Sequence, residues 1–288
     1  MGFCNQGART IATAELTRPA SAPRDPNTPI VVFDDVSIAF DQNEVLQNIS
    51  FKVMPGESRI VLGPAGCGKS VLLKLANGLL LPDSGRITVF GQEVNAMPEE
   101  DLFAFRDRIG MVFQEGALFD SMTVRDNVAY RLIEEHTSAE EIDRRVREVL
   151  RFVELEHTID KFPSELSGGM RRRVAIARAI VSKPDLLLYD SPTGGLDPIT
   201  STTIIEMVVK QRDAFHTSSL LVTHRLQDAF TMATHRFDLE HNKMVPLPDG
   251  HLHPQTSFLM LHDRKLVFDG TTQELVHSKD PFIRNYLE

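Results

Sequence analysis

Short apolar runs alternate with segments of helical periodicity along most of the chain. Strands are expected at residues 30–40, 46–53, 59–62, 86–90, 109–113, 186–189 and 219–222, and helices at residues 71–76, 98–108, 171–181 and 198–215. Strands that alternate with helices in this way predict an α/β fold built on a parallel sheet. Gln114, Asp190 and His224 lie at the carboxyl ends of three of these strands, the edge at which such sheets bind ligands.

A further helix is expected to begin at Ser138. Ser138 and Glu141 have the spacing of a capping box, and an apolar stripe runs from Ile142 to Val153. Acids and arginines four residues apart are expected to pair on the other side of this helix; they are Glu140/Arg144, Glu141/Arg145 and Asp143/Arg147. We interpret this charged run as a solvated helix face rather than a binding patch.

Composition narrows the class of protein. The 288 residues are 42% hydrophobic and 25% charged, as is ordinary for a soluble globular protein. The net charge of −9 argues against a general nucleic-acid binder, and no nucleic acid is expected among the partners. The two cysteines, Cys4 and Cys67, cannot form a disulfide framework, which fits a reducing cytosol. No apolar run approaches the ~20 residues of a transmembrane helix, so a role at a membrane would depend on another chain.

Residues 1–29 differ in composition from the rest of the chain. They are small and polar, contain several prolines and have no hydrophobic core segment of the kind found in signal peptides. We therefore expect a disordered leader at residues 1–29 and a globular domain at residues 30–288.

The clearest chemical motif lies between an apolar strand and a helix. It consists of Gly63, Pro64, Ala65, Gly66, Cys67, Gly68, Lys69 and Ser70, which match the pattern of a phosphate-binding P-loop. In such a loop the backbone N–H groups and the helix N-terminus favour an anion, and glycines let the backbone approach it. Lys69 can then reach the β- and γ-phosphates, and the Ser70 hydroxyl can ligate Mg²⁺. The motif predicts a nucleotide site.

The order of motifs along residues 30–288 resembles the ATP-binding subunit of an ABC transporter. The matching pieces are the P-loop, Gln114, Leu166-Ser167-Gly168-Gly169, Leu186 to Asp190, Gly195-Leu196-Asp197 and His224. The resemblance implies the ABC-ATPase fold of the P-loop NTPases, with a parallel-sheet core, an antiparallel β subdomain and an α-helical signature subdomain at about residues 115–182. It also implies a C-terminal extension at about residues 271–288, and ATP and Mg²⁺ as cofactors.

The resemblance implies roles for single residues. Asp190 would hold the Mg²⁺ shell opposite Ser70. Gln114 would sense Mg²⁺ and the γ-phosphate, and His224 would contact the γ-phosphate. The remaining nucleotide-binding residues would be Phe40, which matches an aromatic that stacks on adenine, Asp197, and Ser167, Gly168 and Gly169, which bind the nucleotide held by the opposite subunit. Core packing is the alternative interpretation of Phe40.

The chain departs from the family pattern at Ser191. The residue after Asp190 is normally a glutamate that polarises the attacking water, and a serine hydroxyl cannot act as that base. General-base catalysis typically contributes about 10²–10⁴-fold to a rate, so we expect intact ATP binding with weak hydrolysis. His224 or the γ-phosphate itself could accept the proton instead.

A closer resemblance is to the ATPases of Mla/Mce-type lipid transporters. It is carried by residues 113–124 and 126–129, by Met170, by Asp197-Pro198-Ile199-Thr200 and by residues 280–284. It implies that two copies pair head-to-tail and dock on an integral-membrane permease that carries an Mce-domain substrate protein, on the cytoplasmic face of the inner membrane. The transported substrate would be phospholipid. The terminal helix would either reach the neighbouring subunit or pack on its own domain.

Several alternatives stay open. The chain could energise another ABC permease, such as a solute importer or a division-type complex, or act as a weakly hydrolysing nucleotide-gated clamp outside transport. Residues 238–256 look like an insertion in the family pattern, and we interpret them as a surface loop; a metal site at His241, His251 and His253 is the alternative. We expect the arginines at 171–173 to pair with nearby acids.

Overall fold

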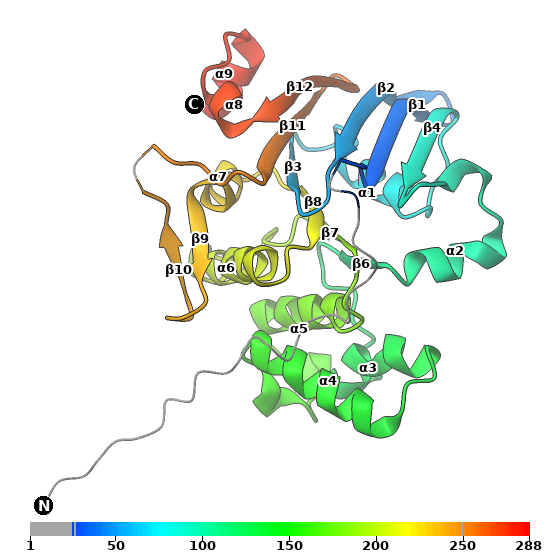
Figure 1. Cartoon of the computed structure of the whole chain (residues 1–288), viewed down its shortest axis with the longest axis vertical. Helices are drawn as coiled ribbons and strands as arrows, with labels where there is room; N and C mark the ends of the chain where they lie inside the picture. Colours follow the sequence, from blue (N-terminus) through cyan, green and yellow to red (C-terminus); the bar gives the residue numbers. More distant parts are fainter. Residues whose placement is uncertain (1–24, 26, 249) are drawn as a thin grey trace, which may run out of the picture.

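A computed structural model describes residue 25, residues 27–248 and residues 250–288 (Figure 1). The expected disordered leader therefore lies, apart from residue 25 and residues 27–29, outside the described residues. The described strands form a central sheet, an antiparallel sheet beside it and a small hairpin. Helices cover the central sheet, and a group of helices extends below it in Figure 1.

The central sheet is parallel except at one edge. Its strand order is β12 (Lys265–Thr271), β11 (Thr256–His262), β3 (Ser58–Leu62), β8 (Ser218–Val222), β7 (Leu186–Asp190) and β6 (Ile109–Val112), with β12 antiparallel to β11. Every residue of β3, β7 and β8 is buried, which explains why these strands are continuous apolar runs in the sequence. The α/β fold with a parallel core is confirmed.

The antiparallel sheet corresponds to the expected β subdomain. Its order is β2 (Asn43–Val53), β1 (Val31–Phe40), β4 (Ser84–Val89) and β5 (Gln92–Glu93). Its apolar face shares one core with α1 (Lys69–Ala76), and Phe33 and Phe51 stack in this core with ring centroids 4.6 Å apart. The sheet therefore braces the helix that follows the P-loop.

The helical region contains α3 (Val124–Glu134), α4 (Ala139–Phe152) and α5 (Gly168–Ile180). Ser138 caps α4 by accepting a hydrogen bond from the N–H of Glu141, but the Glu141 carboxylate pairs with Arg144 and Arg145 rather than completing a capping box. Arg144 thus pairs with Glu141 and Glu148, and the expected Glu140/Arg144 pair stays a prediction. The boundary of about 115–182 for this subdomain stays a prediction.

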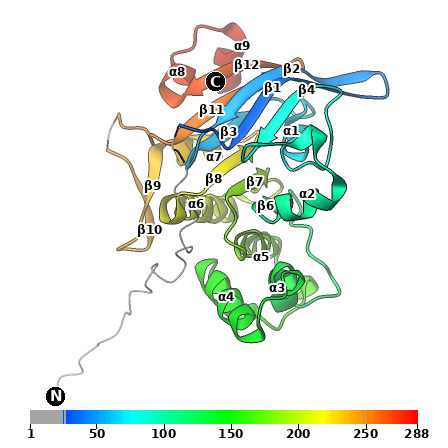
Figure 2. The same ribbon diagram turned by 45° about the vertical axis from the view of Figure 1, so that its right-hand side comes forward.

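The other helices connect the sheets or close the chain. They are α2 (Glu99–Arg106), α6 (Pro198–Phe215), α7 (Leu226–Thr234), α8 (Thr272–Val276), α9 (Pro281–Leu287) and the short 3₁₀ helices η2 (Val94–Ala96), η3 (Glu156–Thr158) and η4 (Pro163–Glu165). In Figures 1 and 2, α8 and α9 lie beside β11 and β12. On α9 the Ile283 side chain is buried in the main core, so the terminal helix packs on its own domain.

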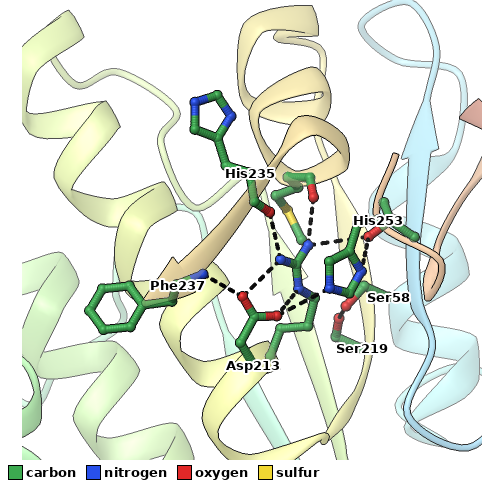
Figure 3. Close-up of polar contacts among 9 residues, drawn as sticks. Ser58, Asp213, Ser219, His235, Phe237 and His253 are labelled. Carbon is green, nitrogen blue, oxygen red and sulfur yellow. Dashed lines mark hydrogen bonds and ion pairs between the residues drawn. The ribbon is translucent and has the colours of Figure 1, made fainter. Parts of the chain in front are cut away.

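Part of the segment that we expected to be a surface loop, residues 238–256, forms a strand. Strands β9 (His235–Asp238) and β10 (Lys243–Pro246) form an antiparallel hairpin that lies on α6. Figure 3 shows the polar cluster that anchors this segment to α6. The Asp213 carboxylate accepts hydrogen bonds from the backbone N–H of Phe237 at 2.6 Å and from the Arg212 guanidinium. His253 Nε2 lies 3.3 Å from the same carboxylate. Arg212 also donates to the His235 carbonyl at 2.8 Å.

Two histidines of this segment contact different carboxylates. His241 Nδ1 lies 2.9 Å from Asp238, whereas His253 contacts Asp213. In the part of the chain that the structure describes, no three His, Cys, Asp or Glu side chains are grouped so as to hold a metal ion. His253 therefore serves as an anchor between the loop and α6. The view of this segment as an insertion stays a prediction.

Candidate nucleotide site

The P-loop joins β3 to α1 and depends on glycine at two tight positions. Gly68 is the N-cap of α1 with φ +94°, and a Cβ there would lie 2.7 Å from Leu46. Gly63 has φ +148°, and a Cβ there would clash with the Leu261 carbonyl and lie 2.8 Å from Cys67 Sγ. Only glycine fits both positions, so the loop can wind tightly and direct backbone N–H groups to one place.

Lys69 lies inside this loop. Its side chain is buried, and Nζ donates hydrogen bonds to the carbonyls of Gly63 at 2.9 Å and Pro64 at 2.7 Å. To bind phosphate oxygens, Nζ exchanges these neutral acceptors for charged ones, which form stronger hydrogen bonds. The lysine is therefore held within the loop where the predicted phosphates would bind.

Ser70 and Asp190 are in direct contact. Ser70 Oγ donates a hydrogen bond of 2.9 Å to Asp190 Oδ1, and the Asp190 side chain is buried at the end of β7. A hydroxyl and a carboxylate oxygen are the hard donors that Mg²⁺ prefers, and the ion usually keeps waters and binds phosphates as well. The residues present thus fit a Mg²⁺ ion bound together with a nucleotide.

Gln114 and His224 lie at the same edge of the sheet as Asp190. Gln114 is exposed after β6, and its side-chain amide lies against Gly194. A Cβ added to Gly194 would lie 3.4 Å from Gln114 Nε2. His224 is exposed two residues after the end of β8. The structure brings these two side chains to the carboxyl edge predicted for them, with polar groups open toward a ligand.

Ser191 is buried in a strained turn directly after Asp190. Its φ is +46°, its N–H donates to the Val222 carbonyl at 2.9 Å, and its own carbonyl accepts from the N–H of Gly194 at 2.9 Å. These bonds tie the end of β7 to the end of β8 and fix the direction of the side chain. A residue at 191 is thus rigidly held beside Asp190.

The start of α5 carries Ser167, Gly168 and Gly169, the residues expected to bind the nucleotide held by the opposite subunit. Ser167 caps this helix by accepting from the N–H of Met170 at 3.3 Å, and Ser167 and Gly168 are exposed. Asp197 caps α6 in the same way through Thr200, whose hydrogen bond lowers the pKa of Asp197. The hydrogen bonds of the Ser167 side chain lie within the start of its own helix, and its role toward a second copy stays a prediction.

Phe40 ends β1 with 43% of its surface exposed, which leaves its ring open to stacking.

The arginines at 171–173 donate hydrogen bonds to backbone carbonyls, and the charges of Glu115 and Glu154 act on Arg172 and Arg173. Arg171 binds the Leu166 carbonyl at 2.6 Å, and Arg173 binds the Val153 carbonyl at 3.3 Å. Arg172 is buried and bridges two loops, with bonds to the carbonyls of Phe113 at 2.9 Å and Gly194 at 3.2 Å. Burial lowers the pKa of Arg172 from its usual value.

Asp228 is a residue that the sequence analysis did not single out. Thr193 Oγ1 donates a hydrogen bond to its carboxylate. Burial raises the pKa of Asp228, while this hydrogen bond and the charges of Arg225 and His224 oppose the rise. Asp228 thus links the loop after β7 to the helix that follows His224. An acid four residues after His224 is the only signal that the sequence offers for it.

A strand–loop–helix unit that holds a lysine and a serine against an acid on a neighbouring strand defines a P-loop nucleotide-binding protein. Residues 46–194 match the family model described as ABC transporter. The chain is also 35% identical over 261 residues to the intermembrane phospholipid transport system ATP-binding protein MlaF of Escherichia coli, covering 90% of this chain and 88% of the relative. The chain therefore belongs to the ABC transporter family of ATPases.

Two further likenesses agree with this assignment. The chloroplastic protein TRIGALACTOSYLDIACYLGLYCEROL 3 of Arabidopsis thaliana is 35% identical over 265 residues, which cover 88% of this chain and 71% of that protein. A dimeric structure of the ATP-binding cassette MJ0796 in a post-hydrolysis state with ADP and Pi superposes with a TM-score of 0.70 at 27% identity, covering 84% of this chain and 98% of the other. Among the described residues, no helix combines the length and apolarity needed to cross a membrane.

Proposed function

We propose that this chain is the ATP-binding subunit of a transporter that uses ATP to move phospholipid between bacterial membranes. The contact between Ser70 and Asp190, beside the lysine of the P-loop, carries the ATP-dependent part of this proposal. The phospholipid part is supported by the 35% identity to a relative whose name assigns it to intermembrane phospholipid transport.

In the proposed mechanism, the P-loop from Gly63 to Ser70 cradles the phosphates and Lys69 binds the β- and γ-phosphate oxygens. Ser70, Asp190 and Gln114 would hold a Mg²⁺ ion, which would supply positive charge that offsets the negative charge of the phosphates. His224 binds the γ-phosphate from the end of β8. Ring stacking on the exposed face of Phe40 holds the base.

A second copy of the chain completes each site. Ser167 and Gly168 are exposed and Gly169 is half-buried at the N-terminus of α5, where backbone N–H groups and the helix dipole favour a phosphate from a facing subunit. Asp197, at the N-terminus of α6, belongs to the same facing surface. The dimeric cassette structure that this chain resembles supports such pairing.

Hydrolysis is proposed to be weak because Ser191 cannot serve as a general base. Phosphoryl transfer depends mainly on positioning and charge stabilisation, so turnover is slowed rather than abolished. His224 or the γ-phosphate then accepts the proton of the attacking water. Ser191 also favours a second candidate function, a nucleotide-gated clamp that binds ATP without much turnover.

The proposed partners are an integral-membrane permease and an Mce-domain substrate protein, with the chain on the cytoplasmic face of the inner membrane. The test is purification of the tagged full chain from membranes of its native host, with proteins identified by mass spectrometry and lipids extracted from the same sample. We expect a permease, an Mce-domain protein and phospholipid, all absent from an untagged control. Recovery with a solute-importer permease, or without any permease, would contradict the proposal.

A further inference from the structure

The C-terminal helix reaches the first residue of the P-loop. The hydroxyl of Tyr286, on α9, accepts a hydrogen bond from the N–H of Gly63 at 3.3 Å and donates one to the Gly63 carbonyl at 3.2 Å. The two residues are 223 positions apart in the sequence, and no motif relates them. One side chain thus satisfies both backbone groups of the glycine at which β3 turns into the loop.

Tyr286 is held in place by the packing of α9. Ile283 is 1% exposed and belongs to the main core, and the Phe282 ring stacks on His262 with centroids 3.6 Å apart and an interplanar angle of 15°. His262 ends β11, and the preceding residue, Leu261, has its carbonyl directly against Gly63. The end of β11 and the helix α9 therefore both lie beside the start of the P-loop.

The Gly63 carbonyl has a second donor, which is Lys69. Lys69 Nζ donates to this oxygen at 2.9 Å, so Lys69 and Tyr286 share one acceptor. When Nζ moves to a phosphate oxygen, Tyr286 remains as the donor to Gly63. Gly63 is buried, and a buried carbonyl without a donor is costly, so this bond matters most when phosphate is bound. Burial raises the pKa of Tyr286, so its hydroxyl keeps the proton that it donates.

We propose that Tyr286 is a positioning residue of the nucleotide site, whose hydroxyl holds Gly63 while Lys69 binds phosphate. The inference rests on the proposed binding of Mg-ATP. It makes nucleotide affinity depend on how α9 is docked. A partner that shifts the C-terminal helix would then change the affinity for ATP without touching the nucleotide.

The test is the substitution Tyr286→Phe in the full chain, which removes the hydroxyl and keeps the ring. Calorimetric titration with Mg-ATP is expected to show a Kd about three- to tenfold higher than that of the wild type, the range expected for one lost hydrogen bond. In turnover assays KM rises by the same factor and kcat stays within about twofold. The melting temperature stays close to that of the wild type. Tyr130→Phe is the matched control, because Tyr130 is exposed on α3 and its ring packs at an angle against Phe119, away from the P-loop.

The outcomes separate this inference from the proposed function. If Tyr286→Phe binds Mg-ATP as tightly as the wild type while Lys69→Ala does not bind, the inference is wrong and the nucleotide site stands. A lower melting temperature with an unchanged Kd assigns Tyr286 to packing alone and also overturns it. If the wild type itself does not bind Mg-ATP, both the inference and the proposed function fail.

Discussion

Ser70 Oγ donates a hydrogen bond to Asp190 Oδ1 at 2.9 Å, which joins the first turn of α1 to the end of β7. The pair is preformed by the register of the sheet, since Asp190 lies level with Val222 of β8 and Val222 lies level with Val61 of β3. Two oxygens that share a proton in this way need only small movements to share a Mg²⁺ ion. The nucleotide site is therefore built by the backbone before any ligand binds.

Asp190→Asn is expected to remove most of the contribution that Mg²⁺ makes to ATP affinity and turnover. The amide keeps the size of the side chain but loses its charge, so Kd for Mg-ATP approaches Kd for ATP in EDTA, and turnover falls by about 10²–10³-fold. Parallel titrations with Mg²⁺ and with EDTA measure the first effect. An Asn variant that retains the full Mg²⁺ dependence would exclude Asp190 as a ligand.

Ser191→Glu is expected to increase ATP turnover. A glutamate at this rigid position places a carboxylate beside Asp190, where it can accept a proton from water, and the gain is about 10²-fold. Steady-state phosphate release under saturating Mg-ATP measures it, with Ser191→Gln as the uncharged control of the same size. Equal rates for the wild type and the Glu variant would remove the general-base explanation for weak hydrolysis.

Arg172→Gln is expected to uncouple two loops of the site. Arg172 donates to the carbonyls of Phe113, next to Gln114, and of Gly194, close to Ser191, so its loss lets both loops move. We expect kcat to fall about tenfold while Kd for Mg-ATP stays within about twofold, because the P-loop is not touched. Arg171→Gln, on the exposed side of the same helix turn, is the control. Equal kcat in the two variants would contradict the role of Arg172.

Local patterns predict part of this fold and miss another part for a physical reason. Residues 186–190 are predictable as a strand because both faces are buried and the run is wholly apolar up to the aspartate. The hairpin at 235–246 is not, because its strands are short and half exposed, with few β-branched residues, and their stability comes from bonds to Arg212 and Asp213 on α6. Likewise the residues of the P-loop can be predicted from their spacing. The contact of Tyr286 with Gly63 cannot be predicted in this way, because it forms only through tertiary packing.

Asp213 is expected to give the fold a dependence on acid pH. Burial raises the pKa of Asp213, but hydrogen bonds from His253 and Arg212 outweigh this and lower it to about 2, from an ordinary value of 3.8. A folded-state pKa below the unfolded one stabilises the protein above about pH 4, and this stabilisation is lost as the pH falls from about 4 toward 2. The shift corresponds to about 2 kcal/mol.

Urea unfolding of the wild type and of Asp213→Asn at pH 5 and at pH 2.5 measures this contribution. At pH 5 the variant is expected to be less stable by about 2 kcal/mol or more, since it also leaves the buried Arg212 guanidinium without its charged partner. At pH 2.5 the difference between the two free energies of unfolding is expected to be smaller, because the wild-type carboxyl is partly protonated. Asp120→Asn, at an exposed position, is the control and should show no gap at either pH. A gap of the same size at both pH values would mean that Asp213 acts through packing and not through its charge.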